Sequence, residues 1–271
     1  MMDDLAERLK TWMRDTGFPL EMEAAHAFRK AGFQVKQSSL FPDPQTGDGR
    51  EIDVLVDDQD LIGIMNISFV IECKATKNGA TRPWIVLRSE DALASFNRAL
   101  AFSIASPGAH TALIEAALSD GMVSRRYLRA DAGGYGFRQA FIDTQSGNDK
   151  KVGKDSLDRG YGATMSVLKA CHRIVFNGES LKTFDFAFPV IVVDAPLFEC
   201  ALDSNGALSL SRVEQSEFLF SAYIPKQVST CITVVTKDAL PTFAANAWVL
   251  TKALREEFGN SASAYFAEHQ L

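Results

Sequence analysis

Two runs of strand-forming residues carry ionisable side chains within them, and this pattern constrains the fold more than any other feature of the chain. The runs are REIDVLV (50–56) and FVIECKA (69–75). Side chains alternate across a strand, so Asp53 lies opposite the apolar residues of the first run, and Glu72 and Lys74 lie opposite those of the second. We expect two neighbouring strands, each burying one apolar face and carrying charge near the end of the other face.

Apolar periodicity and turn residues divide the rest of the chain. The run FAFPVIVVD (186–194) is continuously apolar up to its last residue, which is typical of a central strand covered on both faces. The segment at 144–160 is polar and rich in glycine, serine and lysine, and we expect a mobile loop there. We expect helices at 3–15, 19–31, 90–103, 108–119, 161–175 and 241–258, and strands at 33–41, 51–56, 61–75, 84–87, 186–194, 197–203, 211–223 and 230–237.

The order of these segments predicts an α/β fold in which helices flank a mixed β-sheet. No linker or internal repeat separates one part of the sequence from another, so we expect residues 1–271 to form a single domain. The further strands and helix at 186–258 would then be a C-terminal α/β extension of that domain.

The composition limits the setting and the class of partner. Of 271 residues, 46% are hydrophobic and 23% are charged, which is ordinary for a soluble globular protein. No apolar stretch reaches the roughly 20 residues that cross a membrane, and the N-terminus lacks the apolar core of a signal peptide, so we expect a cytoplasmic protein with no membrane partner. The four cysteines form no CxxC pair, which argues against a disulfide framework or a zinc site. The formal net charge of −6 disfavours nonspecific coating of nucleic acid but is compatible with an enzyme that has a local basic groove.

A third carboxylate stands out in the predicted helix at 19–31. At about 100° per residue, Glu21 falls in the apolar sector of this helix, close to Phe28, whereas Glu23 falls on the polar side. A carboxylate on a buried face needs a partner, because burying an unpaired charge is unfavourable. A metal site or Lys74 would supply that partner. The alternative is a Glu21 that lies at the rim of the core or binds an arginine.

Together these segments resemble the PD-(D/E)XK, or restriction-endonuclease-like, nuclease superfamily. Its members carry an acidic residue on a first helix, an Asp on the second strand and a Glu-x-Lys pair on the third. Glu21, Asp53 and the pair Glu72 and Lys74 match these positions in the same order along the chain. The resemblance covers residues 17–90 and implies a nuclease-like core with a restriction-endonuclease-like mixed sheet. The C-terminal part of the chain matches no subfamily.

The resemblance implies a metal-dependent endonuclease that hydrolyses phosphodiester bonds in DNA, in defence, restriction or repair. Asp53 and Glu72 would be the primary ligands of Mg²⁺ or Mn²⁺, joined by the main-chain carbonyl of Cys73. Glu21 would hold a second ion or orient water. Lys74 would orient or help deprotonate the attacking water, or stabilise the developing charge.

Three further residues are candidates for substrate contacts. Arg82 and Trp84 follow Lys74 closely and would bind a phosphate and stack on a base. Gln37 follows the first motif and would lie near the site. Two of them have ordinary alternatives, with Gln37 at the surface and Trp84 in the core.

Other interpretations of the cluster remain open at the level of sequence. The charges could form a solvated strand end, with Asp53 paired to Arg50 or Lys74. A catalytically silent nucleic-acid-binding or scaffold domain on the same fold is the alternative function, and an effector subunit that needs a partner chain is a third. We expect DNA as the partner, with RNA left open, and the chain could act as a homodimer.

Overall fold

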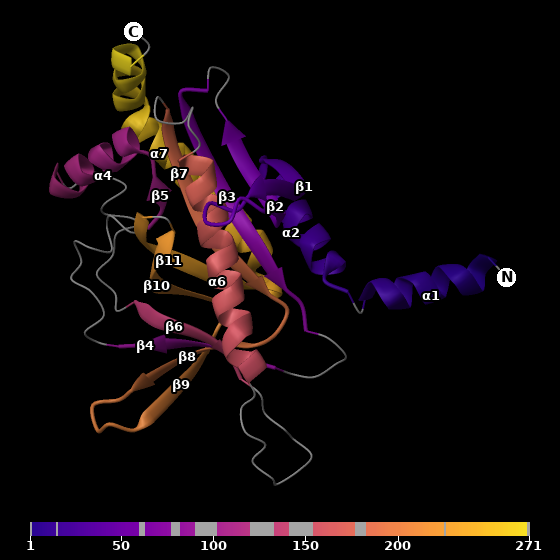
Figure 1. Ribbon diagram of the computed structural model, residues 1–271. Helices are drawn as coiled ribbons and strands as arrows, with labels where there is room; N and C mark the ends of the chain where they lie inside the picture. Colours follow the sequence, from indigo (N-terminus) through magenta and orange to yellow (C-terminus); the bar gives the residue numbers. More distant parts are fainter. Residues whose placement is uncertain are drawn as a thin grey trace.

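One mixed β-sheet with helices on both faces organises the described part of the chain (Figure 1). The structure, a computed structural model, describes residues 2–14, 16–59, 63–76, 82–89, 102–119, 133–140, 154–176, 183–224 and 226–269. The helices are α1 (Met2–Arg14), α2 (Phe18–Ala31), α4 (Pro107–Ser119), α6 (Lys154–Val175) and α7 (Leu240–His269), with a short 3₁₀ helix at Lys237–Ala239. The strands are β1 (Gln34–Pro42), β2 (Gly49–Gln59), β3 (Met65–Lys74), β4 (Trp84–Arg88), β5 (Ile104–Ala105), β6 (Gly134–Gln139), β7 (Phe184–Val193), β8 (Leu197–Leu202), β9 (Leu208–Val213), β10 (Gln215–Ile224) and β11 (Lys226–Thr236).

Three parallel strands in the middle of the sheet finish at the same end of it. The strand order is β1-β2-β3-β7-β11-β10-β6-β4-β8-β9, and the short strand β5 also pairs with β7. β3, β7 and β11 run parallel, so their carboxyl ends at Lys74, Val193 and Thr236 lie at the same end of the sheet. β2 runs antiparallel to both β1 and β3. Ligands of open α/β sheets usually bind outside the carboxyl ends of parallel strands, so this end of the sheet is the natural place for a site.

β7 is the central strand that the continuous apolar run predicts. All ten of its residues are buried. Pro189 is compatible with this position although it has no N–H to donate to a neighbour. On the side away from β3, β5 pairs with Phe186 and Ala187, and β11 pairs from Val190 onward. Pro189 therefore lies in the gap between the part of β7 that pairs with β5 and the part that pairs with β11. Its missing N–H leaves both ladders intact.

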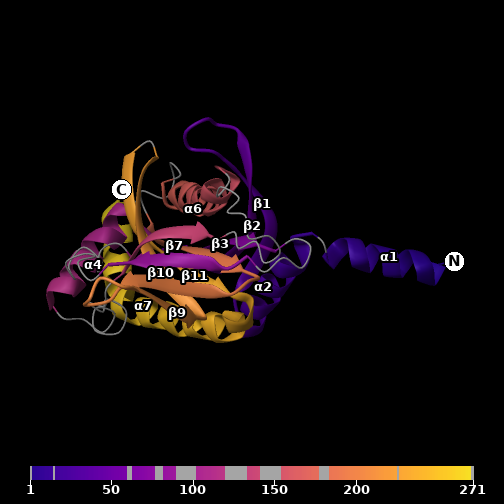
Figure 2. The same ribbon diagram turned by 90° about the horizontal axis from the view of Figure 1, so that it is seen from below.

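Two cores lie on opposite faces of the sheet (Figure 2). α6 covers one face, where Val70 of β3 and Ile191 of β7 pack in the same core as Leu168. α2, α4 and α7 cover the other face, where Phe69 stacks on Phe188 with ring centroids 4.8 Å apart. α1 lies apart from the sheet in both views.

The β1–β2 hairpin bends where Ser38 faces Asp53. The residues on either side of these two pair regularly, but Ser38 has a φ of 52° and the ladder is interrupted there. A positive φ is uncommon for a residue other than glycine and indicates local strain. Val54 packs in the core beneath α2 and α7, whereas Ile52, only two residues away, packs in the core beneath α6. The hairpin therefore changes the face that it buries at this bend, and the part beyond the bend packs against α6.

A buried ion pair attaches the bent hairpin to α6. The side chain of Asp43 is fully buried, and its Oδ2 atom accepts a hydrogen bond of 2.8 Å from Nζ of Lys169 and a second from Nε of Arg50. Burial raises the pKa of Asp43, but hydrogen bonds from Lys169, the N–H of Gln45 and Arg50 outweigh this effect and lower the pKa to about 2. Arg50 thus pairs with Asp43, and the alternative in which it pairs with Asp53 is wrong.

The structure confirms the α/β class and the mixed sheet flanked by helices, and it corrects several boundaries. α6 begins at Lys154, so the expected loop is wrong for residues 154–160. α7 continues to His269, well beyond the expected end at 258. The sequence does not predict β6, because GYGFRQ has two glycines and weak β-forming character. Residues 90–101 and 141–153, which hold most of an expected helix and of the expected loop, lie outside the described residues. None of the described helices is both long and apolar enough to cross a membrane.

Candidate active site

Asp53 and Glu72 face each other at the carboxyl end of β3. The antiparallel ladder between β2 and β3 ends with the pair Val54 and Ile71, and the next position in this register places Asp53 opposite Glu72. Opposed residues of an antiparallel pair lie on the same face of the sheet. The Oδ2 atom of Asp53 accepts a hydrogen bond of 2.7 Å from the main-chain N–H of Cys73. This bond holds the Asp53 carboxylate against the end of β3.

Lys74 completes the predicted Glu-x-Lys arrangement. It lies on the same face as Glu72, and its Nζ atom donates a hydrogen bond to Oε1 of Glu72. The two side chains are 28% and 13% exposed, so the pair is largely withdrawn from water. The interpretation of these charges as a solvated strand end is therefore wrong.

The first turn of α2 directs Glu21 toward the same edge. Glu21 lies three, four and seven residues before Ala24, Ala25 and Phe28, which are all buried, so it shares their side of the helix as the periodicity predicts. Glu23 lies on another side, partly exposed, and forms an ion pair of 2.9 Å with Lys237. The contrast between Glu21 and Glu23 confirms the predicted apolar sector of α2.

Glu21, Glu51, Asp53, Glu72 and Lys74 interact electrostatically near the end of β3. The charges of Glu51 and Glu72, after burial, raise the pKa of Glu21, and Lys74 lowers it. Glu21 and Glu72 in turn act on Asp53. Glu51, two residues before Asp53 on β2, is exposed at the edge of the cluster. We call this set the acidic cluster: Glu21, Glu51, Asp53 and Glu72, with Lys74.

The electrostatic cost of the acidic cluster is concentrated on Asp53. Burial raises the pKa of its carboxyl, and the negative charges of Glu72 and Glu21 raise it further. The hydrogen bond from Cys73 and the charge of Lys74 offset only part of this effect, which leaves a pKa of about 7. Burial and the neighbouring carboxylates therefore favour the protonated form of Asp53, and a bound cation would favour the ionised form.

Replacing Asp53 by asparagine is expected to remove a pH-dependent loss of stability. The pKa of Asp53 is higher in the folded protein than in the unfolded chain, so its contribution to stability is present below about pH 4 and is lost as the pH rises through about 7. An asparagine side chain cannot ionise, and its oxygen can still accept the Cys73 N–H. Urea unfolding between pH 5 and 8 should show a smaller decline in unfolding free energy for Asp53→Asn than for the wild type. Equal declines in the two proteins would contradict the raised pKa.

The donor set of the acidic cluster suits a hard divalent cation. Among the described residues, no three His, Cys, Asp or Glu side chains form a preassembled metal site. Mg²⁺ needs fewer protein ligands, because it binds through one or two carboxylates and keeps several waters. Asp53 and Glu72 fit that requirement, and the excess negative charge around them supplies a reason to take up a cation. The side chain of Cys73 is buried in the core beneath α2 and α7, so this residue meets the site through its main chain alone.

Of the three residues predicted to contact substrate, Gln37 lies elsewhere, and Trp84 cannot stack on a base. Gln37 pairs with Val54, which places it on the α2 face, and its Oε1 atom accepts a hydrogen bond of 3.1 Å from Arg29. Trp84 is 1% exposed and stacks on Phe137 with centroids 4.6 Å apart, so it packs in the core and offers no free ring face to a base. Arg82 precedes β4 and is half-buried, and its role as a phosphate contact stays a prediction.

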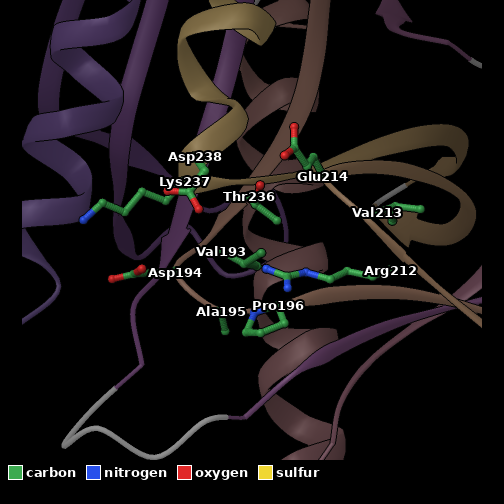
Figure 3. Close-up of a pocket in the computed structure, with 10 residues that line it drawn as sticks. All are labelled: Val193, Asp194, Ala195, Pro196, Arg212, Val213, Glu214, Thr236, Lys237 and Asp238. Atoms are coloured by element: carbon green, nitrogen blue, oxygen red, sulfur yellow. The ribbon is translucent and has the colours of Figure 1, made fainter.

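A pocket of about 500 Å³ adjoins the acidic cluster at the ends of β7 and β11 (Figure 3). It lies near the end of β3, because the N–H of Asp194, one of its lining residues, donates a hydrogen bond of 3.2 Å to the carbonyl of Lys74. Arg212 reaches into it, whereas Lys237 points toward α2. Its lining includes three carboxylates, those of Asp194, Glu214 and Asp238, beside these two cations. This mixed charge gives no clear preference for an anionic or a cationic ligand.

One residue of the acidic cluster was missed in the sequence. Glu51 lies two residues before Asp53, but the hairpin bends at this point, so alternation along the strand does not by itself assign the two residues to one face. A Glu at the start of an expected strand is typical of an ordinary surface residue, so the sequence gives no signal that singles out Glu51.

Comparison with known protein families, with characterised proteins and with solved structures found no match to this chain.

Proposed function

We propose that the protein is a Mg²⁺- or Mn²⁺-dependent nuclease of the PD-(D/E)XK type, with a restriction-endonuclease-like core, that hydrolyses phosphodiester bonds in DNA. The observation that carries this proposal is the convergence of Glu21, Asp53, Glu72 and Lys74. They come from one helix and two strands and interact at one end of β3. A group of partly buried carboxylates around a single ammonium is unfavourable for stability, which is typical of a functional site.

The residues of the cluster have the properties that phosphodiester hydrolysis requires. A bound divalent cation would polarise the phosphoryl group and supply a nucleophilic water at neutral pH. Asp53 and Glu72 would hold it, and the Cys73 N–H keeps Asp53 oriented for this task. Lys74 presents a positive charge that stabilises negative charge developing on the phosphate. Glu21 orients water from the opposite side of the cluster.

A plasmid-nicking assay tests the proposal directly. Supercoiled DNA incubated with the wild-type protein is expected to be converted to nicked or linear forms with Mg²⁺ or Mn²⁺ and to stay supercoiled with EDTA. Cleavage that persists in EDTA would contradict a metal-dependent mechanism. DNA and RNA substrates should be run side by side, because the cluster contains no feature that selects the sugar.

A scaffold domain without catalytic activity is the second candidate, favoured by the net charge of −6. Calorimetric titration with Mg²⁺ and Mn²⁺ separates the two. A nuclease is expected to bind the ion through Asp53 and Glu72, and the binding should disappear in Asp53→Asn. A protein that neither binds the ion nor cleaves nucleic acid would support the scaffold.

A further inference from the structure

A smaller pocket opens beside Lys74. Its volume is about 310 Å³, and it lies between the start of α2, the end of β3, the start of β4 and the first turns of α6. The groups that line it include Lys74, Arg159, Trp84 and Gly17. No carboxylate lines it among the described residues, in contrast to the pocket of Figure 3.

The pocket gathers hydrogen-bond donors that have no acceptor. The guanidinium of Arg159 is exposed and makes no hydrogen bond or ion pair with the described residues. The indole N–H of Trp84 is buried and also has no partner in the described part of the chain. An unpaired buried donor is unfavourable, so native proteins rarely keep one without a reason. Arg159 is thus available to a ligand from solvent, and the Trp84 N–H is the buried donor that lacks an acceptor among the described residues.

The backbone supports the same preference for a negative ligand. α2 begins at the pocket, and its first residue, preceded by Gly17, has no side-chain cap. The N-terminal end of a helix carries a partial positive charge, and the carboxylate of Glu21, in the first turn beside Gly17, offsets part of it in α2. α6 approaches β6 closely at Gly160, where a Cβ atom would lie 2.7 Å from the carbonyl oxygen of Phe137. This close approach sets the neighbouring Arg159 beside the end of β3.

We propose that this pocket is a subsite for a backbone phosphate of the nucleic-acid strand, adjacent to the phosphate that is cut. Lys74 lies between the pocket and the acidic cluster, so a strand that passes over Lys74 presents one phosphate to each. Arg159 and the Trp84 N–H bind the phosphate that is not cut. The pocket is at the small end of the range of ligand sites, which suits one phosphate and its sugar. The identity of this ligand rests on the proposed function, whereas its anionic character rests on the donors alone.

The test measures binding in EDTA, where no cleavage occurs. Single-stranded DNA of about 12 nucleotides, labelled with a fluorophore, is titrated with the wild type, Arg159→Ala and the matched control Arg173→Ala at the far end of α6. Arg159→Ala is expected to weaken binding about tenfold and to lower the salt slope by about 0.7, the value for one lost phosphate contact on a single strand. Trp84→Phe, which keeps the ring stacked on Phe137, should weaken binding several-fold. Equal affinities for the wild type and Arg159→Ala would overturn the proposal.

Two further experiments distinguish a failure of this inference from a failure of the proposed function. Inorganic phosphate, titrated by NMR, should perturb the wild type and not Arg159→Ala whether or not the protein cuts DNA. If the wild type binds phosphate through Arg159 but never cleaves nucleic acid, the nuclease proposal fails and the anion subsite stands. If the wild type cleaves DNA and Arg159→Ala binds and cleaves equally well, the subsite fails and the nuclease stands. Oligonucleotides with and without a 5′-phosphate should bind alike, and a strong preference for the terminal phosphate would assign the pocket to strand ends.

Discussion

Replacing Glu72 by glutamine or Lys74 by methionine is expected to lower the rate of metal-dependent DNA cleavage at least about a hundredfold. Glu72→Gln removes one of the two carboxylates that face each other at the end of β3 and so weakens the hold on the cation. Lys74→Met keeps the length of the side chain but removes the charge that pairs with Glu72 and that would stabilise the phosphate. The measurement is the initial rate of nicking at saturating Mg²⁺.

A matched control distinguishes the loss of chemistry from the loss of fold. Glu115→Gln makes the same substitution at an exposed position of α4 and should cleave at the wild-type rate. Glu72→Gln should unfold at the same or a higher urea concentration than the wild type, because it removes the charge that, after burial, contributes most to the raised pKa of Asp53. Wild-type cleavage by either Glu72→Gln or Lys74→Met would exclude that residue from the mechanism.

The second large effect concerns stability. Replacing Asp43 by alanine is expected to lower the free energy of unfolding by about 3–5 kcal/mol, because it leaves Lys169 buried without its counter-charge. The side chain of Lys169 is only 8% exposed, so little water can reach it to take the place of the carboxylate. The loss should appear as a lower urea midpoint with an unchanged slope. Asp48→Ala, in the same hairpin loop but exposed, should change the free energy by less than about 0.5 kcal/mol.

The acid limb of the stability profile provides an independent check. The pKa of Asp43 is lowered to about 2 in the folded protein, so its contribution is complete above about pH 4 and is lost as the pH falls through about 2. The wild type should therefore lose this stability on acidification, and Asp43→Ala should lack that part of the decline. If the double variant Asp43→Ala with Lys169→Met were as unstable as Asp43→Ala alone, the buried ammonium would not be the cause.

Much of the candidate site could be predicted from neighbouring residues. Alternation in the two charged strands placed Asp53 and Glu72 opposite their apolar neighbours, and the structure brings these two carboxylates together. Helical periodicity separated Glu21 from Glu23, because both residues belong to one helix whose geometry is fixed. The continuous apolar run likewise predicted the buried central strand β7.

Other features depended on which segments meet in space. The partner of Arg50 is Asp43, because the hairpin bends at Ser38 and carries Arg50 toward α6. Trp84 faces the core, although a short apolar strand carries no signal of which face is covered. Gln37 lies on the α2 face and away from the acidic cluster.

The sequence alone determined which residues share a face of one strand or one helix, since alternation and helical periodicity are properties of adjacent residues. Only the tertiary structure decided that Arg159, from a helix that begins about 80 residues beyond β3, lies in the same pocket as Lys74. The physical reason is that contacts between distant segments depend on strand order and on the bend of the β1–β2 hairpin, which arise from packing the whole sheet between its two helical layers.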